Sequence, residues 1–236
     1  METPWAGRYQ VIRVPVPDPQ VLADYASLPL DPYAGGKQRH RRFAQYRMVF
    51  DRAHDDWSLE LLPHRPFVQS SRINGFAGGV LRHFDPLRVS LAPQILAGAR
   101  ALGLDRDEVW QLNVHQNRLV ARAGERGVSV PEGPHRDGHD FSMIAVMDRR
   151  NVTGGRNQLM PSGGGEPFFE VTLEPGQALV FDDGALWHHA TDIAATGPAP
   201  GHRDLCVVAY NRWCNREYGA EYERHALACG ESTPVG

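Results

Sequence analysis

Two short segments of this chain carry side chains that could hold a metal ion. Segment 131–138 reads Pro-Glu-Gly-Pro-His-Arg-Asp-Gly and contains His135 and Asp137, and segment 182–188 ends in His188. Together they offer two imidazoles and one carboxylate. This is the ligand set of the facial triad that binds non-haem Fe(II) and leaves coordination positions open for a co-substrate and O₂.

A His-x-Asp pair carries little information alone, so its surroundings must select among the pairs present. Only one pair lies between a Pro/Gly-rich turn and a continuous apolar run, Phe141–Met147, which is typical of a buried strand. Residues i and i+2 of an extended chain point to the same face, so this pair could grip one ion. The four pairs are His54/Asp56, His83/Asp85, His135/Asp137 and His202/Asp204.

The second segment has the same organisation as the first. A predicted strand, 177–181, leads into a turn at Asp182-Asp183-Gly184, and His188 follows with His189 beside it. Only one of two adjacent histidines can face a metal from an extended segment. Asp182 and Asp183 either orient the ligating imidazole, as carboxylates commonly do, or form the turn itself.

Composition favours a single globular domain. The 236 residues are 42% hydrophobic and 22% charged, with a formal net charge of -3, so nucleic acid is a poor partner. The basic run Lys37–Arg42 is interpreted as a solvated loop. No apolar run is long enough for a bilayer and residues 1–4 do not resemble a signal peptide, which predicts a cytoplasmic protein without a membrane partner.

The elements that must position the candidate ligands are mainly strands. A strand at 9–14 and helices at 18–28, 93–102 and 216–228 are expected around a core of short apolar runs separated by Gly, Pro and Asp. That texture is typical of an antiparallel sandwich or jelly roll. We expect one domain, 1–236, with a mixed buttress (1–109), a jelly-roll core (110–213) and a C-terminal helix and tail (214–236). The core runs are 110–120, 141–148, 168–173, 177–181 and 204–211.

An ordered series of motifs over residues 35–213 resembles the bacterial 2-oxoglutarate/Fe(II) dioxygenases that hydroxylate free amino acids, typified by isoleucine hydroxylase. Each motif is weak alone, and their order makes the resemblance specific. The motifs are Gly36-Lys37 through Phe43, Val114–Arg118, Pro131–Gly133 with His135–Phe141, Asn151–Gly155, Asp182-Asp183 through His188, Thr191, Ile193, and Gly201–Asp204.

The resemblance implies a mainly β, double-stranded β-helix fold (jelly roll, cupin-like) with flanking α-helices. It implies that His135, Asp137 and His188 ligate Fe(II), with His188 preferred over His189 because its spacing from Asp182-Asp183 matches the family. It makes Arg203 the partner of the distal carboxylate of 2-oxoglutarate, and a guanidinium suits that bidentate contact. The reaction would consume O₂ and yield succinate, CO₂ and a hydroxylated aliphatic carbon.

An amino-acid substrate would need a cation for its carboxylate and an acceptor for its ammonium group. Arg118, with Gln116 two residues away on the same strand face, is the candidate cation. Glu132 or Asp140 is the candidate acceptor, and Trp187 could wall an aliphatic side chain.

Other readings of the same residues stay open at this point. Two histidines and one aspartate can also bind Zn²⁺ with an open position, as in a hydrolase, or belong to a cupin-like binding domain without activity. Within the oxygenase class, the same oxidant could desaturate or cyclise a substrate in a biosynthetic pathway. A small molecule is the expected partner, and the protein could be a monomer or a homodimer.

Overall fold

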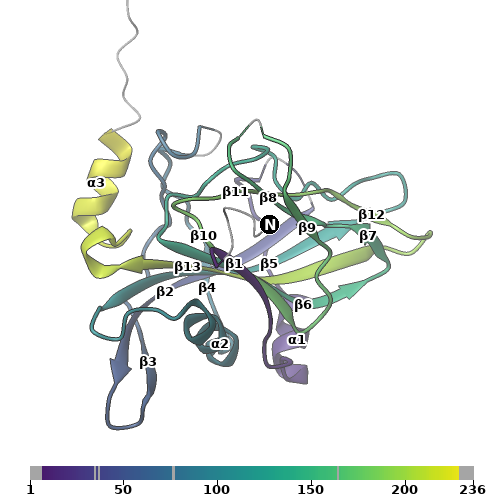
Figure 1. The fold of residues 1–236 in the computed structure, drawn as a ribbon. Helices are drawn as coiled ribbons and strands as arrows, with labels where there is room; N and C mark the ends of the chain where they lie inside the picture. Colours follow the sequence, from purple (N-terminus) through teal and green to yellow (C-terminus); the bar gives the residue numbers. More distant parts are fainter. Residues whose placement is uncertain (1–6, 35, 37, 76–77, 164, 229–236) are drawn as a thin grey trace, which may run out of the picture.

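A large, almost entirely antiparallel sheet forms the body of the molecule (Figure 1). The computed structural model describes residues 7–34, 36, 38–75, 78–163 and 165–228. Seven strands follow one another across the sheet, and a short strand, β4 (Asp85–Pro86), pairs with β2 in parallel. In spatial order the seven are β1 (Tyr9–Arg13), β10 (Gln177–Asp182), β6 (Phe141–Arg150), β13 (Gly201–Arg212), β5 (Trp110–Ala121), β2 (Arg39–Asp51) and β3 (Asp56–Leu61).

Two small sheets cover one face of the large sheet (Figure 1). A cluster of buried apolar residues packs between the large sheet and the strands of the three-stranded sheet. This layered, antiparallel arrangement confirms the predicted mainly β jelly roll. The small sheets consist of β11 (Trp187–Ala190), β8 (Asn157–Met160) and β9 (Phe169–Val171), and of β12 (Ile193–Ala195) and β7 (Val152–Gly154).

Helices α1 (Pro19–Tyr25) and α2 (Ala92–Leu102) cover the opposite face of the large sheet (Figure 1). Asp18 caps α1 by accepting the backbone N–H of Val21 at 2.9 Å, as its place at the start of the predicted helix suggested. Gly98 brings α2 close to the sheet, because a Cβ there would lie 2.5 Å from the Tyr210 hydroxyl. Burial of the apolar residues between helices and sheet stabilises this layer. The chain continues through a 3₁₀ turn (Trp213–Asn215) to α3 (Ala220–Ala228).

The pairing of β13 with β6 contains one irregularity that concerns the pocket. Asp204 pairs with Asp148, whereas the next residue, Leu205, pairs with Val146. One extra residue of β6 is therefore inserted at this point, which is the arrangement of a β-bulge. Because side chains alternate between faces, the insertion changes which residues of β6 share a face with those of β13.

The strand β2 was not anticipated, and the interpretation of its basic start as a solvated loop was wrong. Arg39 opens the strand, and Arg41 and Arg42 are buried within it. Arg42 donates to the carboxylate of Asp24 at 2.6 Å, which explains how a charged side chain is accommodated there. Lys37, the first residue of that basic run, lies outside the described residues.

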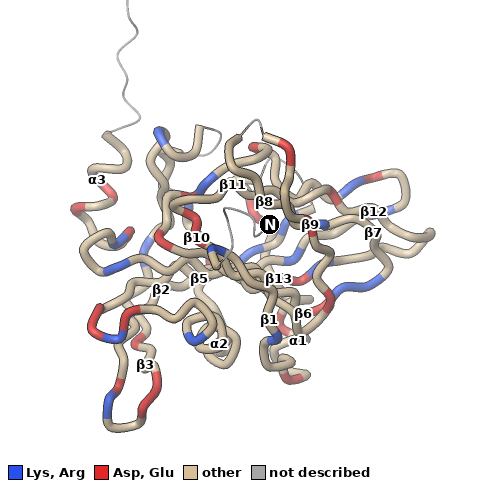
Figure 2. Tube along the Cα trace, viewed as in Figure 1, with Lys and Arg blue, Asp and Glu red and all other residues tan. Residues whose placement is uncertain are grey.

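Basic and acidic residues are interspersed along the chain trace (Figure 2). None of the helices in the described part of the chain combines the length and the apolar composition needed to cross a bilayer. The large sheet includes β1, β2 and β3, so strands that precede residue 110 continue the sheet of the predicted core.

Candidate metal centre and its pocket

The two segments selected from the sequence meet at one end of a pocket on the inner face of the large sheet. His135 and His188 pair through their backbones, with N–H···O distances of 3.0 and 2.8 Å. The Asp137 carboxylate lies 3.6 Å from Nε2 of His135 and 3.4 Å from Nε2 of His188. One donor atom from each of the three residues therefore lies within 4.8 Å of the other two, an arrangement that could hold one metal ion.

Hydrogen bonding fixes which nitrogen of His135 is free. Its Nδ1 lies 2.9 Å from the carbonyl oxygen of Gly133 and donates to it, so Nε2 faces the Asp137 carboxylate. Burial by itself lowers the pKa of His135, but the carboxylates of Asp137 and Glu132 outweigh it and raise the pKa to about 9. A metal ion bound here must displace the proton from this imidazole.

Asp183 contacts both segments that carry the candidate ligands. Its fully buried carboxylate accepts backbone N–H groups from three successive residues, Asp137 at 3.1 Å, Gly138 at 2.8 Å and His139 at 3.0 Å. It also lies 3.4 Å from Nδ1 of His188. Of the two aspartates in the second segment, Asp183 therefore lies beside the candidate ligands. Asp182 serves the turn, where it accepts the N–H of Ala185 at 3.0 Å.

A glutamine that the sequence did not single out also contacts the centre. Gln69 donates from Nε2 to Oδ1 of Asp137 at 3.1 Å, and its Oε1 accepts from Arg82 at 2.8 Å. Its amide thus connects a candidate metal ligand to a buried arginine. Gln69 comes from a loop far from both motifs, and no local pattern around it signals this position.

Arg203 lies on β13 in the same pocket and is 1% exposed. Its Nη2 lies 3.4 Å from Oδ1 of Asn157, and its Nε has no hydrogen-bond partner among the described residues. Burial, helped by the neighbouring Arg149, lowers its pKa to about 10, so it is still charged at neutral pH. A buried guanidinium without a carboxylate partner is an incomplete ion pair, which a carboxylate ligand would complete.

These observations test whether the residues fit the groups that the sequence predicted. Two imidazoles and one carboxylate match the donor preference of Fe(II) in non-haem oxygenases. The uncompensated Arg203 matches one end of a dicarboxylate. The residues present therefore fit both Fe(II) and 2-oxoglutarate.

Two of the predicted substrate residues face away from the pocket, and this corrects the sequence interpretation. Gln116 donates to Asp24 at 3.0 Å, and Arg118 forms a bidentate pair with Asp204 with both distances at 2.7 Å. The alternate residues of β5, His115 and Asn117, line the pocket instead. The expectation that residues i and i+2 share a face was sound, but the wrong face was chosen.

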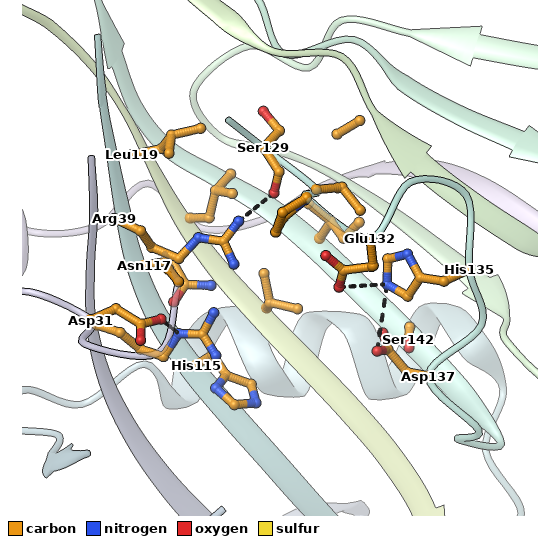
Figure 3. A pocket seen from close by; sticks show the side chains of 18 of the residues that line it. Asp31, Arg39, His115, Asn117, Leu119, Ser129, Glu132, His135, Asp137 and Ser142 are labelled. Atoms are coloured by element: carbon orange, nitrogen blue, oxygen red, sulfur yellow. Dashed lines mark hydrogen bonds and ion pairs between the residues drawn. The ribbon is translucent and has the colours of Figure 1, made fainter. Parts of the chain in front are cut away.

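Of the three remaining predicted substrate residues, one lines the pocket and two do not. Glu132 lines the pocket and lies 3.7 Å from Nε2 of His135 (Figure 3). Asp140 is bonded to Arg212, by a backbone N–H at 2.7 Å and by the guanidinium at 2.8 Å. Trp187 stacks under Arg136, with 5.5 Å from guanidinium carbon to ring centroid. Neither Asp140 nor Trp187 belongs to the pocket lining, so the pocket-facing roles predicted for them are corrected as well.

A second group of possible ligands, Asp148, His202 and Asp204, lies on the outer side of the sheet and is already neutralised. Asp148 lies 2.9 Å from Nε of Arg150, and Asp204 is held by Arg118. His202 contacts Asp148 at 3.1 Å. Both carboxylates form ion pairs with arginines, so we interpret the cluster as an ion-pair network and not as a metal site.

The pocket contains several charged and polar residues that sequence reasoning missed. Asp31, Arg39 and Arg41 come from the N-terminal part of the chain, and Arg82 comes from the loop that precedes β4. Figure 3 shows Asp31 and His115 on one side of the pocket and Glu132, His135 and Asp137 on the other. The basic start of β2 is visible in the sequence, but no local pattern shows that residues 41–45 are all buried and that Arg41 faces the pocket.

Solved structures of other proteins share this fold. The structure is similar to that of a BsmA homologue from Methylobium petroleophilum, with 28% identity, 81% of this chain and 79% of that chain covered, and a TM-score of 0.69. It is also similar to IDO from Bacillus thuringiensis, with 21% identity, 82% and 84% covered, and a TM-score of 0.64. The Fe(II)/α-ketoglutarate-dependent dioxygenase TqaL follows with 12% identity, 87% and 82% covered, and a TM-score of 0.55.

None of the curated proteins compared matches this chain. The model of the 2OG-Fe dioxygenase family matches residues 23–209, which span the pocket from α1 to β13 and include the candidate triad and Arg203. The matched residues make up most of the chain. Members of this family use Fe(II), 2-oxoglutarate and O₂. The chain therefore belongs to the 2OG-Fe dioxygenase family.

Proposed function

We propose that this enzyme hydroxylates an unactivated aliphatic C–H bond of a free L-amino acid or a close derivative, with succinate and CO₂ as co-products. One observation carries the proposal. The pocket that contains the candidate triad is lined by Arg203 and by side chains of both charges, including Arg41, Arg82 and Glu132. A site with paired opposite charges suits a small zwitterion, whose two charged groups need separate partners.

In this proposal the protein's residues hold and orient the reactants. His135, Asp137 and His188 hold the iron, and Arg203 binds the distal carboxylate of 2-oxoglutarate. The bound iron supplies the oxidative chemistry, in which O₂ and 2-oxoglutarate are consumed and one oxygen atom reaches the substrate carbon. Gln69 donates to the carboxylate of Asp137, and Asp183 accepts its backbone N–H, so both residues orient this ligand in the proposal.

The shape of the pocket selects the carbon that reacts. Apolar side chains such as Phe67, Val130 and Leu205 line it together with the charged residues, so an aliphatic side chain can be held away from water. A displacement of about 1 Å from the productive position can lower the rate by roughly a hundredfold. Glu132, which lies beside the candidate triad, receives the ammonium group of the substrate in this arrangement.

The test is mass-spectrometric analysis of products after anaerobic loading with Fe(II), followed by O₂, 2-oxoglutarate and a panel of free L-amino acids. We expect succinate release stimulated by at least one amino acid, together with a product heavier than that substrate by one oxygen atom. His135→Ala and Arg203→Ala should abolish both signals. His189→Ala is the matched control, because the His189 imidazole lies 3.0 Å from Gln158 and does not line the pocket.

Other outcomes separate the alternatives. A product lighter than the substrate by two hydrogen atoms indicates desaturation or ring closure at the same site. Succinate that depends on Fe(II) but that no amino acid stimulates contradicts the amino-acid substrate. Retention of zinc without any 2-oxoglutarate turnover would contradict the oxygenase assignment and favour a hydrolase or a binding domain.

A further inference from the structure

Two buried arginines lie in the pocket on the side away from Arg203. Arg41 is 9% exposed and Arg82 is 7% exposed, and both line the pocket. Arg41 pairs across the sheet with Asn117, and Arg203 pairs with Leu119, so β5 separates the two strands that carry them. Neighbouring strands are about 4.8 Å apart, which places these strands roughly 10 Å from each other. Arg41 therefore belongs to a different part of the pocket from Arg203, and Arg82, whose charge acts on Arg41, lies near it.

The immediate surroundings leave both guanidiniums short of anionic partners. Arg41 has Asp31 at 3.2 Å from its Nε, and the ring of Phe84 with its centroid 5.0 Å from its guanidinium carbon. Arg82 has a neutral partner, Gln69, at 2.8 Å, and stacks on Phe67 at 4.5 Å. Its Nε has no hydrogen-bond partner among the described residues.

The carboxylates around Arg41 and Arg82 do not fully compensate the two positive charges. Asp31 also accepts the backbone N–H of Tyr33 at 2.9 Å, so its capacity is shared. Burial lowers the pKa of Arg41 to about 9 and also lowers that of Arg82. The surrounding carboxylates do not compensate fully, although Asp31 and Glu132 act on both arginines, and Asp137 and Glu217 also act on Arg82. Among the residues that the structure describes, Asp31 is the one carboxylate at ion-pair distance from either guanidinium, and it contacts Arg41. An additional anion would complete the group.

Gln69 connects this pair to the metal centre. Its amide accepts from Arg82 at 2.8 Å and donates to Asp137 at 3.1 Å, so Arg82 is one side chain away from a candidate iron ligand. An anion held by the two arginines would therefore lie within a small molecule's length of the reacting centre. Planar guanidiniums suit a carboxylate better than other small anions of a metabolite backbone, because the two oxygens can each accept a hydrogen bond.

We infer that Arg41 and Arg82 bind the free α-carboxylate of the substrate, and that the enzyme therefore acts on free amino acids and not on esters, amides or carrier-bound aminoacyl groups. The inference rests on the proposed function. It assigns to Arg41 and Arg82 the task that the sequence suggested for Arg118, which is bonded to Asp204 on the other face of the sheet.

The first test compares each stimulating amino acid with its methyl ester and its amide. In the unaltered enzyme the free acid should have a kcat/KM at least tenfold higher than either derivative. Arg41→Gln and Arg82→Gln should each raise KM for the free acid by roughly 10- to 100-fold, the range expected for loss of a charged hydrogen bond. The decisive result is that the preference for acid over ester disappears in these variants.

Controls separate this site from the remainder of the machinery. Arg41→Gln should leave KM for 2-oxoglutarate unchanged, whereas Arg203→Gln should raise it. Arg47→Gln is the matched control on β2, because Arg47 does not line the pocket and its partly exposed side chain has Nη1 3.3 Å from Glu60. Circular dichroism and thermal unfolding establish that each variant is folded, and Arg41→Lys tests whether charge without the planar fork is sufficient.

A second readout does not depend on turnover. Ligand-observed NMR with the metal-free protein should detect binding of the free amino acids but not of their amides, and Arg41→Gln should remove the signal. An unaltered enzyme that processes ester and acid equally well, or variants that keep the preference for the acid, overturns the inference while the oxygenase function stands. Absence of Fe(II)-dependent succinate in every assay would instead contradict the proposed function.

Discussion

The carboxylate of Asp183 accepts the backbone N–H of Asp137 at 3.1 Å across 46 residues of sequence. It also accepts the N–H groups of Gly138 and His139. Gly138 has a φ of +85°, a conformation that favours glycine, and this lets three successive N–H groups converge on one carboxylate. Asp183 therefore binds the segment that carries two of the candidate ligands to the segment that carries the third.

Asp183→Asn should loosen this connection. The amide keeps the shape of the carboxylate but places donor hydrogens against backbone donors, so we expect metal affinity to fall by about 10- to 100-fold. Titration of the metal-free protein with Co²⁺, followed by its absorption spectrum, measures the change. Asp182→Asn is the control, because Asp182 pairs with Arg8 away from the ligands. Equal affinities in the two variants would contradict this role for Asp183.

Metal affinity should depend on pH through His135. Its pKa is raised to about 9 in the metal-free protein, so metal binding at neutral pH displaces a proton. As the pH is raised toward that value, metal affinity should increase by roughly tenfold per pH unit, and above that value it should level off. Anaerobic Co²⁺ titrations between pH 6 and 10 test this. Glu132→Gln removes a carboxylate that raises this pKa, so the plateau should begin at a lower pH.

Arg118→Met should damage the fold and not the kinetics. Asp204 is buried, and Arg118 is its bidentate partner, so loss of the guanidinium leaves a buried charge unpaired. The expected cost is about 3–5 kcal/mol of unfolding free energy, measured by urea denaturation. Arg118→Met/Asp204→Leu should recover much of it. A raised KM for the amino acid in the folded fraction, without lost stability, would restore the original prediction for Arg118.

The stability of the unliganded protein should fall below pH 6.5 partly because of His115. Burial, followed by Arg41 and Arg82, lowers its pKa well below its usual value. Below the pKa of His115 in the unfolded chain, the unfolded chain binds a proton that the folded chain does not. The contribution of His115 to the free energy of unfolding is therefore full above that pKa, and it is lost as the pH falls toward the lower pKa of the folded protein. Comparison of urea unfolding of the unaltered protein and His115→Phe at pH 8 and pH 5.5 should show a smaller decrease in the variant.

The sequence predicted the parts of this molecule that depend on local patterns. Short apolar strands with Gly/Pro turns gave the jelly roll, and the i, i+2 spacing selected His135 and Asp137, which the structure brings beside His188. Their function as ligands stays a prediction. Local spacing also shows which residues of a strand share a face, but only packing decides which face is inside. The sequence alone therefore does not show that His115 and Asn117, and not Gln116 and Arg118, line the pocket.

Long-range partners were beyond the reach of the sequence. Arginines are unusual in a buried strand. Arg41 and Arg42 are buried here because each forms an ion pair with an aspartate from another part of the chain, Asp31 and Asp24 respectively. Gln69 carries no motif, and its importance comes from two bonds to residues that are distant in sequence. Buried charge is accepted where partners exist, and partners are a property of the tertiary structure.

The residue that β6 inserts beside Asp204 and Leu205 has an electrostatic consequence. Beyond it Arg149, and not Asp148, stands directly across from Arg203, so two guanidiniums occupy adjacent positions on one face. Their mutual repulsion adds to the cost of burying Arg203. Arg203 lines the pocket and Arg149 lies across from it, and a dicarboxylate bound to Arg203 would offset the repulsion between the two guanidiniums. A single extra residue in one strand thus places a second positive charge across from Arg203.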